Sequence, residues 1–82
     1  MDENNRFIII GRRSCPFCIR ALDYCTANQV PSVFLDYAES AHILEDYKKF
    51  YNHKTVPIIL ANNLETGYTK KVGGYTDLLN FI

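Results

Sequence analysis

The stretch Phe7-Ile8-Ile9-Ile10-Gly11-Arg12-Arg13-Ser14-Cys15-Pro16-Phe17-Cys18 decides the fold. Its first four residues form a short apolar run ended by a glycine, which predicts a strand buried on both faces of a sheet. Pro16 suits the first turn of a helix, because its missing N–H is one that a helix start leaves unbonded in any case. A buried strand that leads into a helix beginning near Cys15 predicts an α/β fold.

The rest of the chain continues to alternate between helical and extended patterns. The first helix is predicted to run from Cys15 to Asn28, with Cys18, Leu22 and Cys25 on one inward-facing stripe. The later predicted elements are a strand at 32–35, a helix at 38–51, strands at 58–61 and 69–72, and a short helix at 75–81. The order β-α-β-α-β-β-α implies two parallel strands joined by a right-handed crossover and followed by a hairpin.

The composition is that of one small soluble domain covering residues 1–82. Hydrophobic residues make up 48% of the chain and charged residues 22%, which is ordinary for a globular fold. A chain of 82 residues is too short to build a second core. Nine acidic and nine basic residues cancel, so the electric field that gathers nucleic acid phosphates is missing. We therefore expect a monomer without a nucleic acid partner.

The apolar runs and the cysteines bear on the location of the protein. No apolar run approaches the ~20 residues of a membrane span, and the start of the chain lacks a signal-peptide pattern. We therefore expect a cytoplasmic protein with no membrane partner. Three cysteines leave one unpaired, and the reducing cytosol disfavours structural disulfides. Catalytic or metal-binding cysteines are the better interpretations.

The Cys15-Pro16-Phe17-Cys18 motif is the sharpest chemical signal. At positions i and i+3 of a helix the two sulfur atoms lie on adjacent turns, close enough to form a disulfide with little backbone movement. Cys15 is predicted to lie where unpaired helix N–H groups carry roughly half a positive charge, beside Arg12. We expect Cys15 to be a thiolate nucleophile, and the deeper Cys18 to be an ordinary thiol that resolves a mixed disulfide.

The other cysteine and the histidines have simpler interpretations. Cys25 is about 15 Å along the helix from Cys15, too far for a disulfide, and is predicted to be a core residue. His42 and His53 do not complete a zinc site, because the second pair of ligands at finger spacing is missing. We therefore predict no metal ligands. Arg13 is expected to be solvated.

Two later motifs are ambiguous by themselves. Thr55-Val56-Pro57 can simply start a strand, and the sequence does not assign a cis bond before Pro57. Gly73-Gly74 can be only a tight turn, although the helix that follows it would offer N–H groups to a carboxylate. Both interpretations remain open at this point.

Taken together, Gly11-Arg12-x-x-Cys15-Pro16-Phe17-Cys18, Thr55-Val56-Pro57 and Gly73-Gly74-Tyr75-Thr76-Asp77 resemble the dithiol glutaredoxins in order and spacing. The resemblance covers residues 6–81. It implies a thioredoxin-like fold, with a four-stranded mixed sheet and helices on both faces. It also implies a thiol-disulfide oxidoreductase in which Cys15 accepts glutathione, the co-substrate, and Cys18 resolves protein disulfides.

The resemblance further assigns a glutathione site. Pro57 would be cis, so that the Val56 backbone pairs with the cysteinyl part of glutathione. Arg12 would face the glycyl carboxylate, and Thr76 and Asp77 would lie at the γ-glutamyl end. The remaining residues implied at the groove are Thr55, Gly74, Tyr75 and Phe17. The family commonly has tyrosine where this chain has Phe17, so a hydroxyl is lost there.

The partners implied are glutathione and disulfide-containing or glutathionylated proteins. A reductase such as ribonucleotide reductase is one recipient of electrons known for the family, although nothing in the sequence singles it out. The alternative is an iron-sulfur or metal carrier that uses Cys15 with glutathione, against which Pro16 argues, because cluster-binding members generally have a small residue there. A third alternative, an inactive interaction domain, conflicts with the intact cysteine pair.

Overall fold

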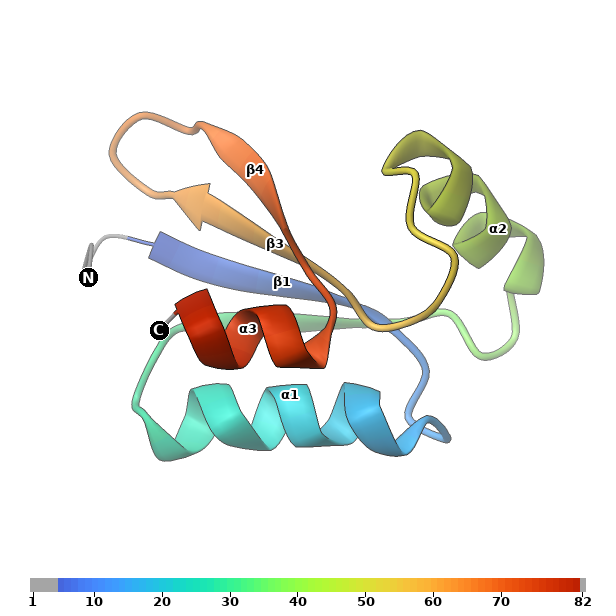
Figure 1. Ribbon diagram of the computed structural model, residues 1–82, viewed down its shortest axis with the longest axis horizontal. Coiled ribbons are helices and arrows are strands. Elements are labelled where there is room, and N and C mark those ends of the chain that lie inside the picture. Colours follow the sequence, from blue (N-terminus) through green and yellow to red (C-terminus); the bar gives the residue numbers. More distant parts are fainter. Residues whose placement is uncertain (1–4, 82) are drawn as a thin grey trace.

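The computed structural model describes residues 5–81, and Figure 1 shows a central sheet with helices packed around it. The strands are β1 (Asn5–Gly11), β2 (Ser32–Asp36), β3 (Ile58–Asn63) and β4 (Thr69–Gly73). The helices are α1 (Pro16–Ala27), α2 (Ala41–Phe50) and α3 (Tyr75–Phe81). The element order is the predicted one. Within residues 5–81, none of the helices has the length and apolar character needed to cross a bilayer.

The four strands form one mixed sheet in the order β2-β1-β3-β4. Strand β1 pairs with β2 in parallel and with β3 in antiparallel orientation. Strands β3 and β4 form an antiparallel hairpin. The predicted parallel pair and the predicted hairpin are both confirmed. Strand β1 is an inner strand of the sheet. The connection from its C-terminal end to α1 therefore begins near the middle of that end of the sheet.

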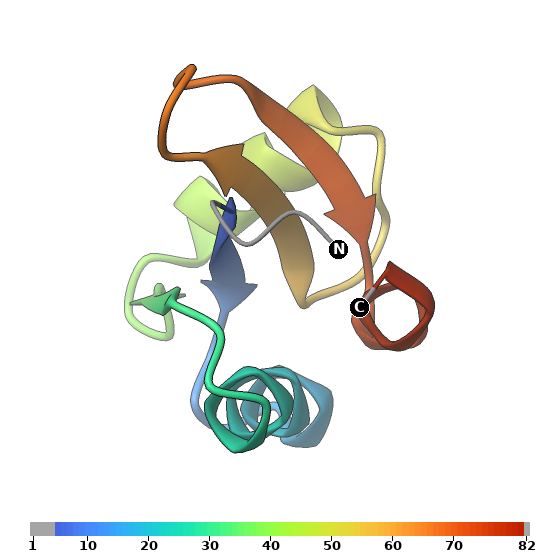
Figure 2. The same cartoon turned by 90° about the vertical axis from the view of Figure 1, so that its left-hand side faces the viewer.

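Helices cover both faces of the sheet, because alternate residues of a strand point to opposite sides. Phe7 and Ile9 pack on one side with residues of α1 and α3, including Leu78. Ile10 packs on the other side with Leu44 of α2. Figure 2 shows α1 and α3 together on one face and α2 on the opposite face. Each fully buried side chain, such as Ile9, contributes about 1.5–3 kcal/mol to folding.

The predicted bounds of several elements are wrong by a few residues. Helix α2 begins at Ala41 rather than at 38, because a turn intervenes in which the Asp36 carboxylate accepts a 3.0 Å hydrogen bond from the Ala38 N–H. The buried stripe of α1 contains Ala21, whereas Leu22 is only partly buried. Strand β3 continues two residues beyond its predicted end, to Asn63, because that stretch still pairs with β1.

Candidate active site

Cys15 lies where β1 leads into α1. It is the N-cap residue of α1, with extended backbone angles (φ −90°, ψ 117°), and Pro16 takes the first helical position. The Cys15 carbonyl accepts hydrogen bonds from the N–H groups of Cys18 and Ile19 at 3.1 and 3.2 Å, which closes the first turn. The half-buried side chain of Cys15 therefore lies at the helix end that carries partial positive charge.

The surroundings of Cys15 favour its thiolate. Burial raises the pKa of Cys15, but hydrogen bonds from the Cys18 thiol and from the backbone N–H groups of Cys18 and Phe17 outweigh it, and the charge of Arg12 acts in the same direction. The net effect lowers the pKa of Cys15 below its ordinary value of 9.0. The direction agrees with the sequence-based prediction.

Cys18 lies one turn deeper in α1 and is fully buried. Burial, followed by the neighbouring Cys15, raises the pKa of Cys18 to about 12, and this outweighs the opposite effect of the Arg12 backbone and charge. Gly11 makes the position of Cys18 possible, because a side chain at residue 11 would overlap the Cys18 sulfur. The site therefore combines a sulfur whose thiolate form is favoured with a second sulfur that stays protonated and donates a hydrogen bond to it.

Alkylation of Cys15 is expected to persist to lower pH than alkylation of a free cysteine. The thiolate is the reactive form, and the pKa of Cys15 is lowered, so reactivity is lost only when the pH falls below that lowered value. The measurement is the rate of iodoacetamide modification against pH, with Cys15→Ser as the blank. A midpoint at the value for free cysteine, about 8.5, would contradict the assignment.

A groove of about 460 Å³ opens beside the cysteine pair. The Val56–Pro57 peptide bond at its wall is cis, as the resemblance implies. The Cys15 sulfur lies 3.9 Å from the Val56 carbonyl oxygen, which places the nucleophile at the edge of the groove. The groove is lined by Phe17, His53, Thr55, Val56, Pro57, Gly74, Tyr75, Thr76 and Asp77. The structure thus brings together all the residues predicted for glutathione except Arg12.

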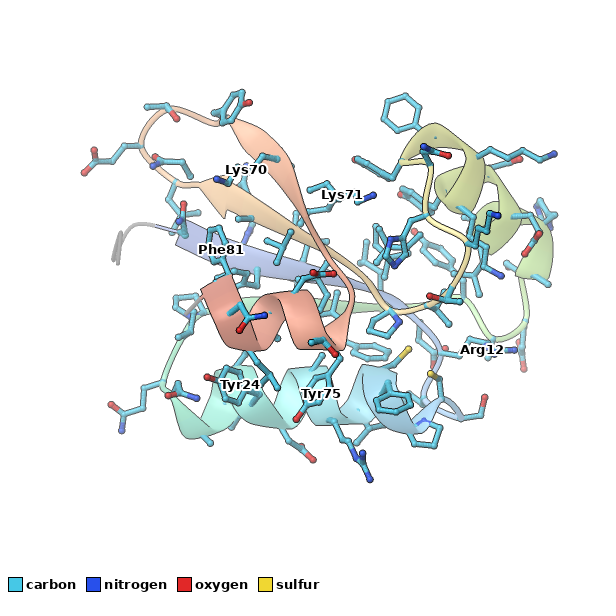
Figure 3. The ribbon with its side chains drawn as sticks, viewed as in Figure 1. Arg12, Tyr24, Lys70, Lys71, Tyr75 and Phe81 are labelled. Atoms are coloured by element: carbon cyan, nitrogen blue, oxygen red, sulfur yellow. The ribbon has the colours of Figure 1, made fainter. Side chains whose placement is uncertain are left out.

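An aromatic edge borders the groove. The rings of Phe17 and Tyr75 lie with their centroids 6.0 Å apart, and the Phe17 side chain remains half exposed. Arg20 lies over the other side of this edge, with its guanidinium carbon 5.3 Å from the centre of the Phe17 ring. Tyr75 is labelled in Figure 3, between α3 and α1. The edge gives the groove an apolar lip next to Cys15.

A tight turn before α3 forms another part of the groove wall. Gly73 has a φ of +126°, a conformation that side chains rarely adopt. The Asp77 carboxylate accepts a 2.9 Å hydrogen bond from the Gly74 N–H, so it caps the start of α3. A side chain at Gly73 would overlap the Asp77 carboxylate. The double glycine therefore forms a tight turn, and Asp77 holds that turn.

Comparison with solved structures identifies the fold. Reduced glutaredoxin from Escherichia coli superposes with a TM-score of 0.68 at 25% identity, covering 93% of this chain and 91% of that one. The chain is glutaredoxin-like. A wheat glutaredoxin superposes with a TM-score of 0.75 at 18% identity, over 92% of this chain and 67% of the other. Glutaredoxin 1 from Francisella tularensis, in complex with cacodylate, superposes with a TM-score of 0.63 at 22% identity, covering 93% of this chain and 90% of that one.

These likenesses are structural rather than sequence-wide. No protein-family model matches the sequence, and no curated protein sequence matches it at a significant level. The glutaredoxin-like fold, together with the cysteine pair at the start of α1, supports a function in thiol-disulfide oxidoreduction. The predicted thioredoxin-like fold with a mixed sheet is confirmed.

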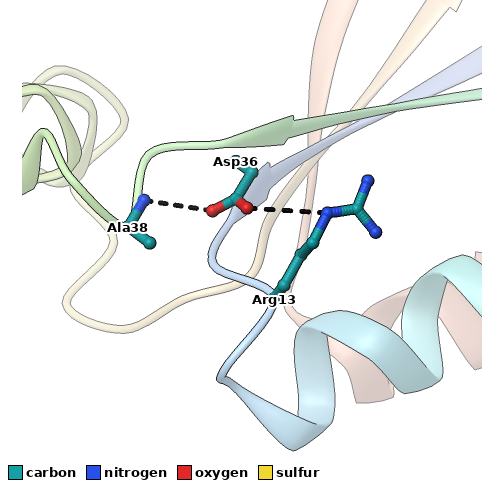
Figure 4. A network of polar contacts seen from close by, with 3 residues as sticks. All are labelled: Arg13, Asp36 and Ala38. Atoms are coloured by element: carbon teal, nitrogen blue, oxygen red, sulfur yellow. Dashed lines mark hydrogen bonds and ion pairs between the residues drawn. The ribbon is translucent and has the colours of Figure 1, made fainter.

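The two arginines of the glutaredoxin-like site lie outside the groove. Arg12 is exposed on the β1–α1 connection, where Figure 3 labels it, and its carbonyl accepts a 3.1 Å hydrogen bond from the Cys15 N–H. Arg13 was expected to be solvated, and its side chain is largely exposed, yet its Nε lies 3.6 Å from an Asp36 carboxylate oxygen. Figure 4 shows that the Asp36 carboxylate also accepts a hydrogen bond from the Ala38 N–H. Asp36 therefore links the cysteine loop to the end of β2.

His53 is a groove residue that sequence patterns do not reveal. It has no local motif, and its only signal is its position two residues before Thr55. Its Nε2 is buried beside Gly74 and has no hydrogen-bond partner among residues 5–81. Burial and the charge of Lys71 lower the pKa of His53, against an opposing effect of Asp77. The lowered pKa favours the neutral imidazole.

The remaining cysteine lies apart from the glutaredoxin-like site. Cys25 is fully buried in the core, as predicted, and burial raises the pKa of Cys25. Within the described part of the chain, no three His, Cys, Asp or Glu side chains are grouped so as to hold a metal ion.

Proposed function

We propose that this protein uses glutathione to reduce mixed disulfides and protein disulfides. One observation carries the proposal: the thiolate-favoured Cys15 lies at the edge of a groove, against the carbonyl of Val56, with the protonated Cys18 one turn deeper. A nucleophilic thiolate beside a peptide-sized groove, backed by a second thiol, is the arrangement that disulfide exchange requires.

The first reaction is exchange with a glutathione mixed disulfide. The Cys15 thiolate attacks the glutathionyl sulfur, which forms a Cys15–glutathione disulfide and releases the other thiol as a thiolate that takes up a proton. A second glutathione thiolate then attacks the glutathionyl sulfur bound to Cys15. Glutathione disulfide leaves, and Cys15 departs as a stabilised thiolate. A lowered pKa makes Cys15 a good leaving group in this second step.

The second reaction uses both cysteines on a protein disulfide. Cys15 attacks one sulfur of the substrate, and Cys18 then gives up its proton and attacks the Cys15 sulfur. The substrate leaves as a dithiol, and a Cys15–Cys18 disulfide remains. Two glutathione molecules reduce that disulfide in turn. Because the pKa of Cys18 is high, we propose that its proton passes to the departing substrate thiolate.

We place glutathione in the groove beside Cys15. A volume of about 460 Å³ lies within the usual range for small-ligand sites. The Val56–Pro57 segment, with its cis bond, lines the groove, and we propose that the tripeptide pairs with its backbone. The rings of Phe17 and Tyr75 border the groove on one side. Arg12 remains the proposed partner of the glycyl carboxylate. Because Arg12 lies outside the groove, the glycyl end of glutathione would extend beyond the groove to reach it.

The proposal extends to the setting of the reaction. We propose a cytoplasmic monomer that acts on glutathionylated and disulfide-containing proteins, with electron donation to a reductase such as ribonucleotide reductase as one use. These roles share a single requirement, which is access of a substrate sulfur to the half-buried Cys15.

The test is a turnover assay in which the substrate is a mixed disulfide of glutathione with a small thiol, and glutathione is the reductant. The formation of glutathione disulfide is followed over time. Steady turnover is expected, with parallel double-reciprocal plots, because the enzyme alternates between free and glutathionylated forms. A dithiol reductant without glutathione serves as the comparison. Absence of turnover with glutathione, or equal rates with any monothiol in its place, would rule out the proposed co-substrate. Visible absorbance after anaerobic purification would instead favour a cluster carrier.

A further inference from the structure

A second hollow with basic walls adjoins the groove. It has a volume of about 300 Å³ and is lined by Glu45, Lys48, Lys49, Asn52, His53 and Lys54, and we call it the basic hollow. His53 lines both the basic hollow and the groove, so the two are adjacent. A substrate protein whose disulfide enters the groove beside Cys15 can therefore place a neighbouring segment at the basic hollow.

The charges around the basic hollow do not cancel locally, although those of the whole chain do. The Lys48 ammonium is paired with Glu45 at 2.9 Å. Lys49 and Lys54 are exposed, and neither has an ion pair within residues 5–81. Lys71 adds a charge close by, because its Nζ donates a 3.0 Å hydrogen bond to the Tyr51 carbonyl. Figure 3 shows Lys71 reaching from β4 towards the C-terminal end of α2.

Helix capping does not account for this cluster. Lys48 and Lys49 lie in the last turn of α2, where positive charge is favourable in any helix. Lys54 comes from the segment before Thr55, and Lys71 comes from β4. Three separate segments therefore bring ammonium groups to one end of the groove. The nearest groove carboxylate, that of Asp77, is engaged by the Gly74 N–H.

We propose that the basic hollow docks an acidic segment of the substrate protein, close in sequence to the cysteine whose disulfide enters the groove. This inference rests on the proposed function, because it names the class of protein substrate. Carboxylates of aspartate or glutamate complement the free ammonium groups of Lys49 and Lys54. Exposed charges at the rim of an interface mainly accelerate association, and salt screens their effect.

The first experiment measures docking without redox chemistry. Short peptides carry serine in place of the reactive cysteine, flanked by glutamates in one version and by lysines in the other. Amide signals of residues 48–54 are followed by NMR as each peptide is added. The glutamate peptide is expected to shift these signals, and Lys49→Gln/Lys54→Gln is expected to weaken its binding about fivefold or more. Equal shifts with the lysine peptide, or none with either, would overturn the inference.

The second experiment measures kcat/KM on glutathionylated cysteine peptides with glutamate, glutamine or lysine flanks. The glutamate peptide is expected to react about tenfold faster than the lysine peptide at low salt, and the difference should shrink at about 0.15 M salt. The Lys49→Gln/Lys54→Gln variant should lose this preference. Lys70→Gln should keep it, because Lys70 lies over the Phe81 ring at the far end of the hairpin.

A small glutathione mixed disulfide separates the two proposals. Lys49→Gln/Lys54→Gln should turn it over at the wild-type rate, because that substrate carries no acidic segment. An equal loss on the small substrate and on the glutamate peptide would overturn the inference, since the lysines would then serve glutathione itself. Failure of the wild-type protein on every substrate would count against the proposed function alone, and the NMR experiment would still decide the docking surface.

Discussion

Replacing Cys15 with serine is expected to abolish turnover of a glutathione mixed disulfide, with a loss of at least about a thousandfold. Serine keeps the size of the side chain but is not ionised at neutral pH, so no nucleophile remains at the start of α1. The buried Cys18 cannot replace it, because its sulfur is enclosed and the pKa of Cys18 is raised to about 12. The measurement is the steady-state rate with glutathione as reductant.

Cys18→Ser is the matched variant, and it separates the two reactions. It is expected to retain turnover of the small mixed disulfide, which needs Cys15 alone, and to lose reduction of an intramolecular protein disulfide. Serine at residue 18 keeps a hydrogen-bond donor towards Cys15, whereas alanine removes it. Cys18→Ala should therefore move the midpoint of Cys15 alkylation to higher pH, because the hydrogen bond from Cys18 lowers the pKa of Cys15. Equal losses in both assays for Cys18→Ser would show that the assigned roles are wrong.

Gly73→Ala is expected to destabilise the protein by about 2–4 kcal/mol, because it combines backbone strain with loss of a helix cap. The φ of Gly73 is +126°, where a side chain is strained. The new methyl group would also displace the Asp77 carboxylate from the Gly74 N–H. For a domain of this size, the loss corresponds to a fall in Tm of roughly 8–32 °C.

Gly67→Ala is the control for backbone strain alone. Gly67 also has a positive φ, +75°, but a side chain there would meet nothing within 4 Å. We expect this variant to lose only about 1 kcal/mol. Urea or thermal unfolding of both variants gives the comparison. Equal losses at the two positions would mean that the hydrogen bond between the Gly74 N–H and the Asp77 carboxylate contributes nothing to stability.

The elements that position Cys15 could be predicted from sequence because their signals are local. An apolar run ended by Gly11 and a proline directly after Cys15 specify a strand and a helix start within a few residues. The inward position of Cys25 follows from helix periodicity in the same way, and it is confirmed. The assignment of glutathione to the groove residues rests on the resemblance and stays a prediction.

Features that depend on distant pairings could not be predicted. Arg13 finds Asp36 because β1 and β2 lie side by side, although the two residues are far apart in sequence. His53 reaches the groove because the approach to β3 packs against the turn after β4. The predicted start of α2 is too early, because the helical composition at 38–40 does not show that the Asp36 side chain holds that segment in a turn.

The burial of two of the three sulfur atoms makes the native protein easy to label. Cys18 and Cys25 have no exposed surface, so a bulky maleimide or a spin label meets a single accessible thiol, that of Cys15. A fluorophore can therefore be attached at one defined atom without removing the other cysteines. The reporter would stand at the mouth of the groove, where it would compete with any ligand that occupies the site.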